Sequence, residues 1–159
     1  SADIPPSKFP FPKNNGSELP DYELAFTRAW TSLGPSITPD GLCDFEHPQR
    51  LITDSDSLPL SWELFDRELT LTLQDVPDRR VALLPREISR GTHGVELTFD
   101  GFDYLGVWCA GSGCPFVAIE PWTGVATALD EDDVFEHKRN MTLLSPDETF
   151  SRTFTIRPF

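Results

Sequence analysis

Several features are scarce in this sequence of 159 residues, and each scarcity narrows the class of protein. No apolar run approaches the roughly 20 residues that a membrane-spanning helix requires, so we expect no membrane span or membrane partner. The first residues lack the positively charged and then apolar pattern of a secretory signal. The sequence therefore predicts a soluble, cytoplasmic protein.

Basic residues are also scarce. There are 13 Lys and Arg against 26 Asp and Glu, which gives a formal net charge of -13 and a pI of about 4.4. Such a surface repels phosphate backbones, so a nucleic-acid partner is not expected. A small neutral molecule such as a sugar is compatible with this charge. Acidity alone selects no substrate, and it more often serves solubility.

Cysteine is limited to three residues, and none has the spacing to histidine that a metal site requires. Cys109 and Cys114 flank a short Gly-containing turn that a disulfide could close, but free thiols in a reducing cytosol are the favoured interpretation. The acidic run 130–133 lacks the spaced ligands and the turn glycine of a calcium loop. We therefore expect no metal and no cofactor.

Uninterrupted stretches long enough for helices are few, because 15 prolines and 10 glycines are scattered along the chain. Residues 1–20 are rich in proline and are predicted to form an irregular arm, followed by a single domain over 21–159. One short helix is predicted over 58–67, with Ser61 as its N-cap.

The remaining chain shows short segments that alternate between apolar and polar residues or run apolar over strand length. The segments 31–41 and 53–57 have turn composition instead. This pattern predicts an all-β fold, an antiparallel β-sandwich. The predicted strands are 22–30, 68–73, 80–84, 95–99, 104–109, 115–120, 141–144 and 149–156.

One strand ends in a candidate functional group. Phe116 to Ile119 is a continuous apolar run, so both faces of the strand should be buried. Glu120 shares a face with Phe116, and Pro121 is expected to end the regular pairing at the carboxylate. Trp122 offers an aromatic plane beside it.

A carboxylate in this position could act as a base. Loss of hydration disfavours its charged form and raises its pKa toward the range useful for proton abstraction. An aromatic plane beside an acidic acceptor suits a sugar, which has apolar C–H faces and a rim of hydroxyls. The structural alternative is a Glu paired with a nearby Arg at a strand end, which is the commoner role.

The same residues carry a family resemblance. The run 104–108, the Gly-containing turn, the segment 115–122 and Gly124 together resemble the aldose 1-epimerase family, most closely a bacterial mutarotase-like branch with an IEPW signature. The similarity covers roughly residues 58–159 and is strongest over 104–122. It implies that the β-sandwich is the C-terminal half of a galactose mutarotase-like super-sandwich.

The resemblance also implies an activity and site residues. Aldose 1-epimerases interconvert the α and β anomers of a hexose without a cofactor, by acid–base opening of the ring. Glu120 matches the general base of the family, and Trp122 lies beside it as a substrate-binding residue. Glu68 stands where the family has an Asp that binds sugar hydroxyls; a plain surface role for Glu68 is the alternative.

Part of the family pattern is missing from this sequence. No histidine precedes the segment 9–12, where the acid of the family would be sought, and His47, His93 and His137 are predicted to be solvated loop residues. The N-terminal half of the sandwich is not represented. A missing N-terminal half or a second chain could complete the fold. The alternative function is a non-catalytic carbohydrate-binding or structural β-sandwich.

Overall fold

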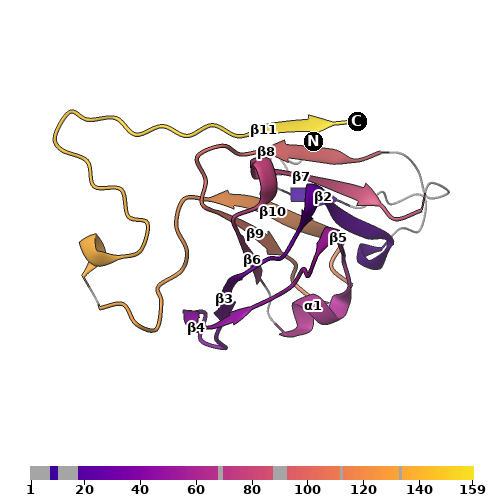
Figure 1. Cartoon of the computed structure of the whole chain (residues 1–159), viewed down its shortest axis with the longest axis horizontal. Helices are drawn as coiled ribbons and strands as arrows, with labels where there is room; N and C mark the ends of the chain where they lie inside the picture. The colour runs from indigo at the N-terminus through magenta and orange to yellow at the C-terminus, as the bar shows by residue number, and fades with distance from the viewer. Residues whose placement is uncertain (1–7, 11–17, 68–69, 88–92, 112, 133) are drawn as a thin grey trace.

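The fold was analysed in a computed structural model, which describes residues 8–10, 18–67, 70–87, 93–111, 113–132 and 134–159 (Figure 1). Almost all of its regular structure is β-strand, as the sequence predicts. Short 3-10 helices occur at Leu19–Asp21, Pro77–Arg79 and Phe135–His137. The longer elements are β1 (Lys8–Pro10), β2 (Tyr22–Trp30), β3 (Gly34–Ile37), β4 (Cys43–Gln49), β5 (Ser55–Pro59), α1 (Trp62–Arg67), β6 (Thr70–Gln74), β7 (Arg80–Pro85), β8 (Val95–Thr98), β9 (Tyr104–Trp108), β10 (Phe116–Trp122) and β11 (Thr155–Pro158).

Two antiparallel sheets form the sandwich. One has the strand order β1-β10-β9-β6 and the other β11-β8-β7-β2-β5. The hairpin β3-β4 lies beside β6, where Leu33 and Gln74 form an isolated antiparallel bridge. The all-β sandwich predicted from the sequence is therefore confirmed, and none of the described helices is long and apolar enough to cross a membrane.

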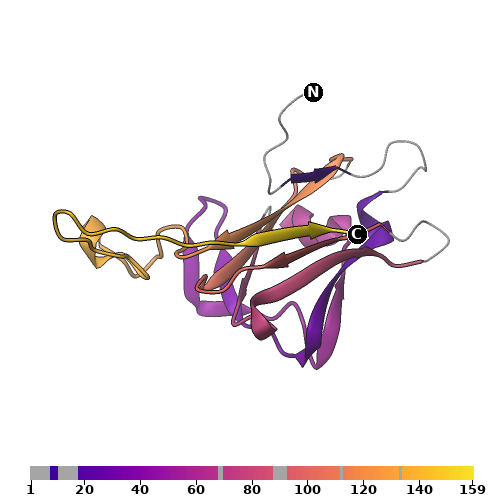
Figure 2. The same ribbon diagram turned by 90° about the horizontal axis from the view of Figure 1, so that it is seen from above.

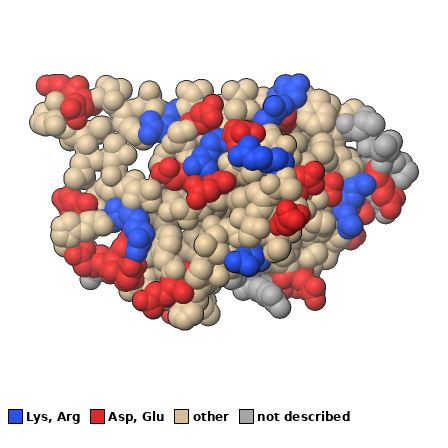
Figure 3. Space-filling model, viewed as in Figure 1, with Lys and Arg blue, Asp and Glu red and all other residues tan. Residues whose placement is uncertain are grey.

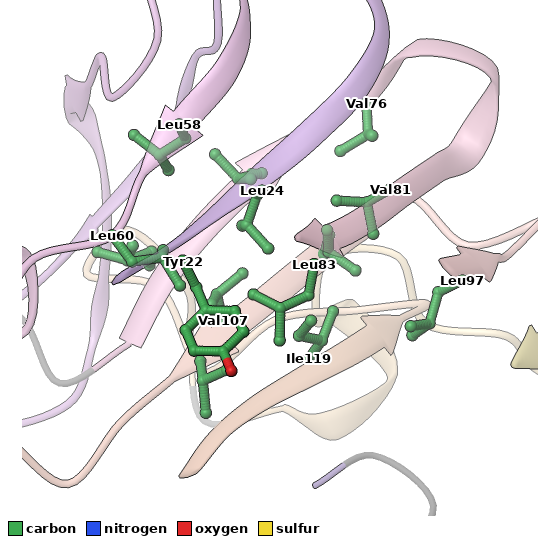
Figure 4. Close-up of a cluster of buried hydrophobic side chains, with 14 of the residues drawn as sticks. Tyr22, Leu24, Leu58, Leu60, Val76, Val81, Leu83, Leu97, Val107 and Ile119 are labelled. Atoms are coloured by element: carbon green, nitrogen blue, oxygen red, sulfur yellow. The ribbon is translucent and has the colours of Figure 1, made fainter. Parts of the chain in front are cut away.

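The core lies between the two sheets. Strand β2 contributes Tyr22 and Leu24 from alternate positions, and β7 contributes Leu83 (Figure 4). Val107 and Ile119 meet them from the opposite sheet, and both are fully buried. Burying a side chain of this size stabilises a fold by about 1.5–3 kcal/mol, so alternation along these strands fixes which face of each sheet turns inward.

Several element predictions are confirmed and others are wrong. Strands were found at 22–30, 80–85, 95–98 and 104–108, and the helix α1 lies within the predicted segment 58–67. The segments 31–41 and 53–57, predicted as turns, contain β3 and the start of β5. Strand β4 was not predicted, because its sequence CDFEHPQ is polar and contains a proline.

Of two predicted strands near the C-terminus, one is wrong and the other is confirmed only at its end. Residues 141–144 form no strand, and of the predicted strand 149–156 only the end is extended, as β11 at Thr155–Pro158. The physical reason is the partner, because β11 pairs with β8, which is only four residues long. An alternating pattern forms a strand only where a neighbouring strand accepts its hydrogen bonds.

Pairing does not stop at the carboxylate of Glu120, contrary to the sequence prediction. Pro121 pairs in register with Leu105, and Trp122 with Tyr104. Proline is tolerated in a sheet where its position requires no donated hydrogen bond. Strand β10 consequently carries Glu120 within its length and not at its end.

The predicted irregular arm of residues 1–20 is described only in part. Lys8–Pro10 form β1, which pairs with Phe116 to Ala118 of β10. This short strand occupies the edge of the sheet that contains the candidate base. The division of the chain at residue 20 and the single-domain organisation remain predictions.

One ion cluster around a largely covered carboxylate joins three strands on the outer face of the second sheet. Glu96 of β8 accepts hydrogen bonds from Arg80 of β7 at 2.5 and 2.8 Å, and from Arg157 of β11 at 3.1 Å. The Glu96 side chain is only 14% exposed. The hydrogen bonds from Arg80, together with the charge of Arg157, hold the pKa of Glu96 below its usual range.

We predict that Glu96→Gln destabilises the protein at pH 7 by about 1 kcal/mol, a modest value because both arginines are half exposed. A carboxyl with a lowered pKa stabilises the fold above its unfolded pKa of about 4.3, and this stabilisation is lost as the pH falls through the folded value. The variant should therefore lose less stability than the native protein between neutral pH and pH 3.

Urea unfolding at both pH values measures this difference. Asp56→Asn on β5 is the control, because Asp56 is exposed and none of the described residues bonds to it. An equal acid-induced loss of stability in native protein and Glu96→Gln would contradict the assignment.

A second constraint is the close approach of β3 to β6. A Cβ added to Gly34 would lie 2.0 Å from the carbonyl oxygen of Thr72. Because that atom belongs to the backbone, the strand itself would have to move.

We predict that Gly34→Ala lowers the free energy of unfolding by about 1–3 kcal/mol, the usual cost of forced overpacking. Gly124→Ala is the matched control, because its Cβ would meet its nearest neighbour, the carbonyl oxygen of Arg139, at an ordinary 3.7 Å. Thermal unfolding of both variants measures the effect. Equal melting temperatures would refute the tight contact.

Candidate functional site

The candidate site lies on the face of the β1-β10-β9-β6 sheet that points away from the main core. Glu120 is directly opposite Gly106, and Gly106 is directly opposite Thr72. Paired residues of neighbouring strands project to the same face, so these three residues form one row across the sheet. Val117 and Ile119 alternate with this face and point into the core.

The indole ring of Trp122 covers the middle of this row. A Cβ added to Gly106 would lie 2.4 to 2.7 Å from three carbons of that ring. Only glycine at position 106 leaves room for the ring, which therefore lies directly beside the position of Glu120. The aromatic plane that the sequence predicts next to the carboxylate is present in the fold.

A small second core holds the Trp122 ring in place. It consists of the buried residues Cys43, Tyr104, Val125 and Ala128, and Trp122 packs against it. Tyr104 stands opposite Trp122 in the sheet register. Burial, helped by the charge of Asp103, raises the pKa of the Tyr104 phenol, and its hydroxyl donates to Asn140 at 3.1 Å.

On the side of Glu120 away from Trp122, two further aromatic rings pack against each other. Trp108 stands opposite Ala118 and packs against Phe116 with ring centroids 5.9 Å apart. Along β10, the face runs from Phe116 through the buried Ala118 to Glu120 and then Trp122. The carboxylate is thus flanked by aromatic groups in both directions.

The carboxylate of Glu120 has no polar partner in the described part of the chain. Its side chain is partly buried, and no hydrogen bond or ion pair to a described residue involves it. An arginine clamp, the structural alternative weighed from the sequence, has no counterpart among those residues. The carboxylate is therefore free to accept a hydrogen bond from a ligand.

Thr72 was not identified from the sequence. Its hydroxyl is buried and makes no hydrogen bond among the described residues. An unsatisfied buried hydroxyl costs stability, so its retention requires an explanation. The signal was present in the alternation TLTLQ of β6, which places Thr72 on the face opposite the core residues Leu71 and Leu73.

The three histidines are exposed to solvent, as predicted, and no described contact joins any of them to Glu120. His47 lies in β4 and not in a loop, and its Nδ1 is 2.9 Å from Asp44, which raises the His47 pKa. The Nδ1 of His137 lies 2.9 Å from a carboxylate oxygen of Asp132. Each of these two rings is already occupied by a local carboxylate.

Glu68, the other substrate-binding residue that the resemblance implies, lies outside the described residues. No group of three or more His, Cys, Asp and Glu side chains in the described chain could hold a metal ion. A pocket of about 340 Å³ is lined by Pro20, Asp21, Arg86 and Glu87, and one of about 190 Å³ by residues between Thr127 and Lys138. Glu120 lines neither of them.

The loop between β9 and β10 carries two of the cysteines, and all three cysteines are free thiols. Cys109 is fully buried, and burial raises the pKa of its thiol to about 11. Cys114 is partly exposed, with its sulfur 3.2 Å from the carbonyl oxygen of Phe116. The disulfide that the spacing would allow is not formed.

Comparison with known proteins places this geometry in context. No protein-family model matches the chain. The chain is 30% identical over 149 residues to the chromosomal LacX protein of Lactococcus lactis subsp. lactis, a match that covers 93% of this chain and 48% of LacX. The plasmid LacX protein of the same organism matches to the same extent. The chain thus spans about half the length of these curated relatives.

Two solved structures share the fold. A galactose mutarotase related enzyme from Lactobacillus acidophilus superposes with a TM-score of 0.81 at 24% identity, over 96% of this chain and 49% of that one. A galactose mutarotase-like protein from Lactobacillus casei gives a TM-score of 0.67 at 21% identity, over 95% and 49%. The chain therefore has the β-sandwich fold of galactose mutarotase-like proteins, over a span that corresponds to about half of such a protein.

Proposed function

We propose that this chain is part of an aldose 1-epimerase of the bacterial mutarotase-like branch with the IEPW motif, which interconverts the α and β anomers of a hexose. The fold shared with the Lactobacillus galactose mutarotase related enzyme supports this proposal, as does the 30% identity to LacX. The observation that carries it is the unpaired carboxylate of Glu120 between two groups of aromatic rings.

In the proposed reaction Glu120 removes the proton from the anomeric hydroxyl of the sugar. A general acid gives a proton to the ring oxygen, the bond between C1 and that oxygen breaks, and C1 becomes the carbonyl carbon of the open-chain aldehyde. Rotation about the C1–C2 bond presents the other carbonyl face. The reverse transfers then close the ring, and the proton held by Glu120 returns to the new anomeric hydroxyl.

The flanking groups have separate roles in this proposal. The indole of Trp122 packs against the apolar C–H face of the sugar and orients C1 toward Glu120. The general acid comes from the remainder of the protein, because the three histidines of this chain are exposed and two of them are bonded to aspartates. About half of LacX and of the Lactobacillus acidophilus enzyme lies outside the match to this chain, and in this proposal that half supplies the acid.

We expect Glu120→Gln to reduce the rate of mutarotation of fresh α-galactose or α-glucose by about 100-fold or more, since general base catalysis commonly contributes that much. Polarimetry on the complete protein follows the rate. Glu63→Gln on α1 is the matched control, because Glu63 is exposed and lies outside the site. A Glu120→Gln rate equal to that of native protein would remove Glu120 as the base.

The second candidate function is sugar binding without catalysis. It is favoured by one specific observation, namely that no described histidine contacts Glu120. A base alone leaves the ring oxygen unprotonated, so this half of the sandwich would bind a sugar and leave its anomeric ratio unchanged. In that case Glu120 only accepts a hydrogen bond from a sugar hydroxyl.

Binding measurements distinguish the two functions. Trp122→Ala should weaken galactose binding by about three- to tenfold, because an aromatic contact contributes about 0.5–1.5 kcal/mol, while Trp122→Phe should retain most of the affinity. Titration calorimetry measures both variants, and circular dichroism checks their folding. Trp62→Phe on α1 serves as the control outside the site.

Binding by the native protein without any mutarotation would select the non-catalytic function. Affinity that is unchanged in Trp122→Ala would show that the ring does not contact the sugar.

A further inference from the structure

Two thiols lie close together at the end of the hairpin that β9 and β10 form. Cys109 directly follows β9 and alternates with Leu105 and Val107, so it belongs to the face that is turned toward the main core. Its side chain is fully buried. Cys114 precedes β10, is half-buried and packs against the same core. The two side chains therefore enter one core from the two sides of a single loop.

Hydrogen bonds within the loop hold both cysteines near one backbone group. The carbonyl oxygen of Gly111 lies 3.7 Å from the sulfur of Cys109 and accepts a hydrogen bond from the backbone N–H of Cys114 at 3.1 Å. The thiols also interact directly. Burial is the main cause of the raised Cys109 pKa, and a side-chain hydrogen bond with Cys114 adds to it. Two thiols in this arrangement can be joined by a small movement of the loop.

The loop has room for that movement. A disulfide brings the two sulfurs to about 2.05 Å, so the atoms must approach. A Cβ added to Gly111 or Gly113 would meet nothing within 4 Å, which shows that the backbone at these two positions is surrounded by open space. Strand β1 pairs with the first residues of β10 (Figure 2) and keeps that strand in place while the loop adjusts.

The two thiols differ in their access to solvent. Cys114 is half-buried between the exposed residues Gly113 and Pro115, and its thiol donates to the carbonyl oxygen of Phe116 at 3.2 Å. An accessible thiol beside a second thiol that can displace a reagent from it is typical of redox-sensitive cysteine pairs. Cys114 is therefore the thiol that a reagent reaches first.

The third cysteine belongs to another part of the fold. Cys43 is buried in the small second core, beside Tyr104, Val125 and Ala128. Cys109 and Cys114 belong to the main core instead. The pair in the β9–β10 loop is thus separated from Cys43 by its packing.

We propose that Cys109 and Cys114 form a reversible oxidation site, which low-molecular-weight disulfides convert to an intramolecular disulfide. The Cys114 thiolate attacks one sulfur of the reagent and expels a thiolate, which takes up a proton. The Cys109 thiolate then attacks the Cys114 sulfur of the mixed disulfide, and the second reagent thiol leaves. The two protein thiols lose two electrons and two protons, and the reagent disulfide is reduced to two thiols.

The test uses the full 159-residue chain and the neutral reagent bis(2-hydroxyethyl) disulfide. A neutral reagent is chosen because the net charge is -13 and acidic side chains are spread over the face seen in Figure 3, which would repel an anionic disulfide. Alkylation of the denatured chain followed by intact mass spectrometry counts the thiols that remain.

We expect the native chain to fall from its three free thiols to one. Before alkylation its mass should be lower by about 2 Da, the two hydrogens lost. Dithiothreitol should restore all three thiols. The mixed disulfide should account for less than about a tenth of the chains, because a neighbouring thiol reacts as an intramolecular group.

Variants identify the two cysteines. Cys114→Ser should keep both of its thiols, and Cys109→Ala should retain the reagent as a mixed disulfide on Cys114. Cys43→Ala is the matched control and should still lose two thiols, as the native chain does. Circular dichroism checks the folding of each variant. If Cys109→Ala does not fold, Cys114→Ser and Cys43→Ala still decide which pair reacts.

Four results would overturn the proposal: a native chain that keeps three thiols in excess reagent, a mixed disulfide on Cys114 that persists while Cys109 stays reduced, loss of two thiols in Cys114→Ser, and disulfide-linked dimers in place of the internal bond. The readout is the mass of the chain and not mutarotation. The proposal therefore stands or falls separately from the role of Glu120.

Discussion

The two-residue repeat of β10, held in register by β9, is the constraint on which the rest of the structure depends. It sends Val117 and Ile119 into the main core and leaves Ala118, Glu120 and Trp122 on the opposite face. The residues that stabilise the sandwich and the residues that could bind a sugar are thus neighbours on one strand. A shift of one position would exchange the two sets and remove both at once.

Two glycines, Gly106 and Gly34, shape the candidate site on this face. Gly106 gives the Trp122 ring its position, and the backbone of Gly34 brings β3 against β6 close to Thr72. A larger side chain at Gly106 would displace the Trp122 ring, and one at Gly34 would push β3 away from β6. The fold therefore uses the absence of a side chain to bring an aromatic plane beside a carboxylate, which the chemistry proposed for Glu120 requires.

Strands could be predicted from the sequence where the alternation of apolar residues matches the face that is buried. Strands 22–30, 80–85 and 104–108 are apolar on their inward face, and so they could be predicted. The face of Glu120 followed from the same alternation. Strand β4 could not be found in this way, since its side chains are largely exposed and its hydrogen bonds depend on β3. The position of Trp122 over Gly106 depends on register between strands, which no local pattern specifies.

Burial of Cys109 lowers the reactivity of this thiol in the β9–β10 loop. With a pKa of about 11, about one thiol in a thousand is ionised at pH 8, and only the thiolate attacks disulfides or alkylating reagents. Attack by the Cys109 thiol on such reagents is therefore slow. The strand that carries Glu120 begins directly after this loop.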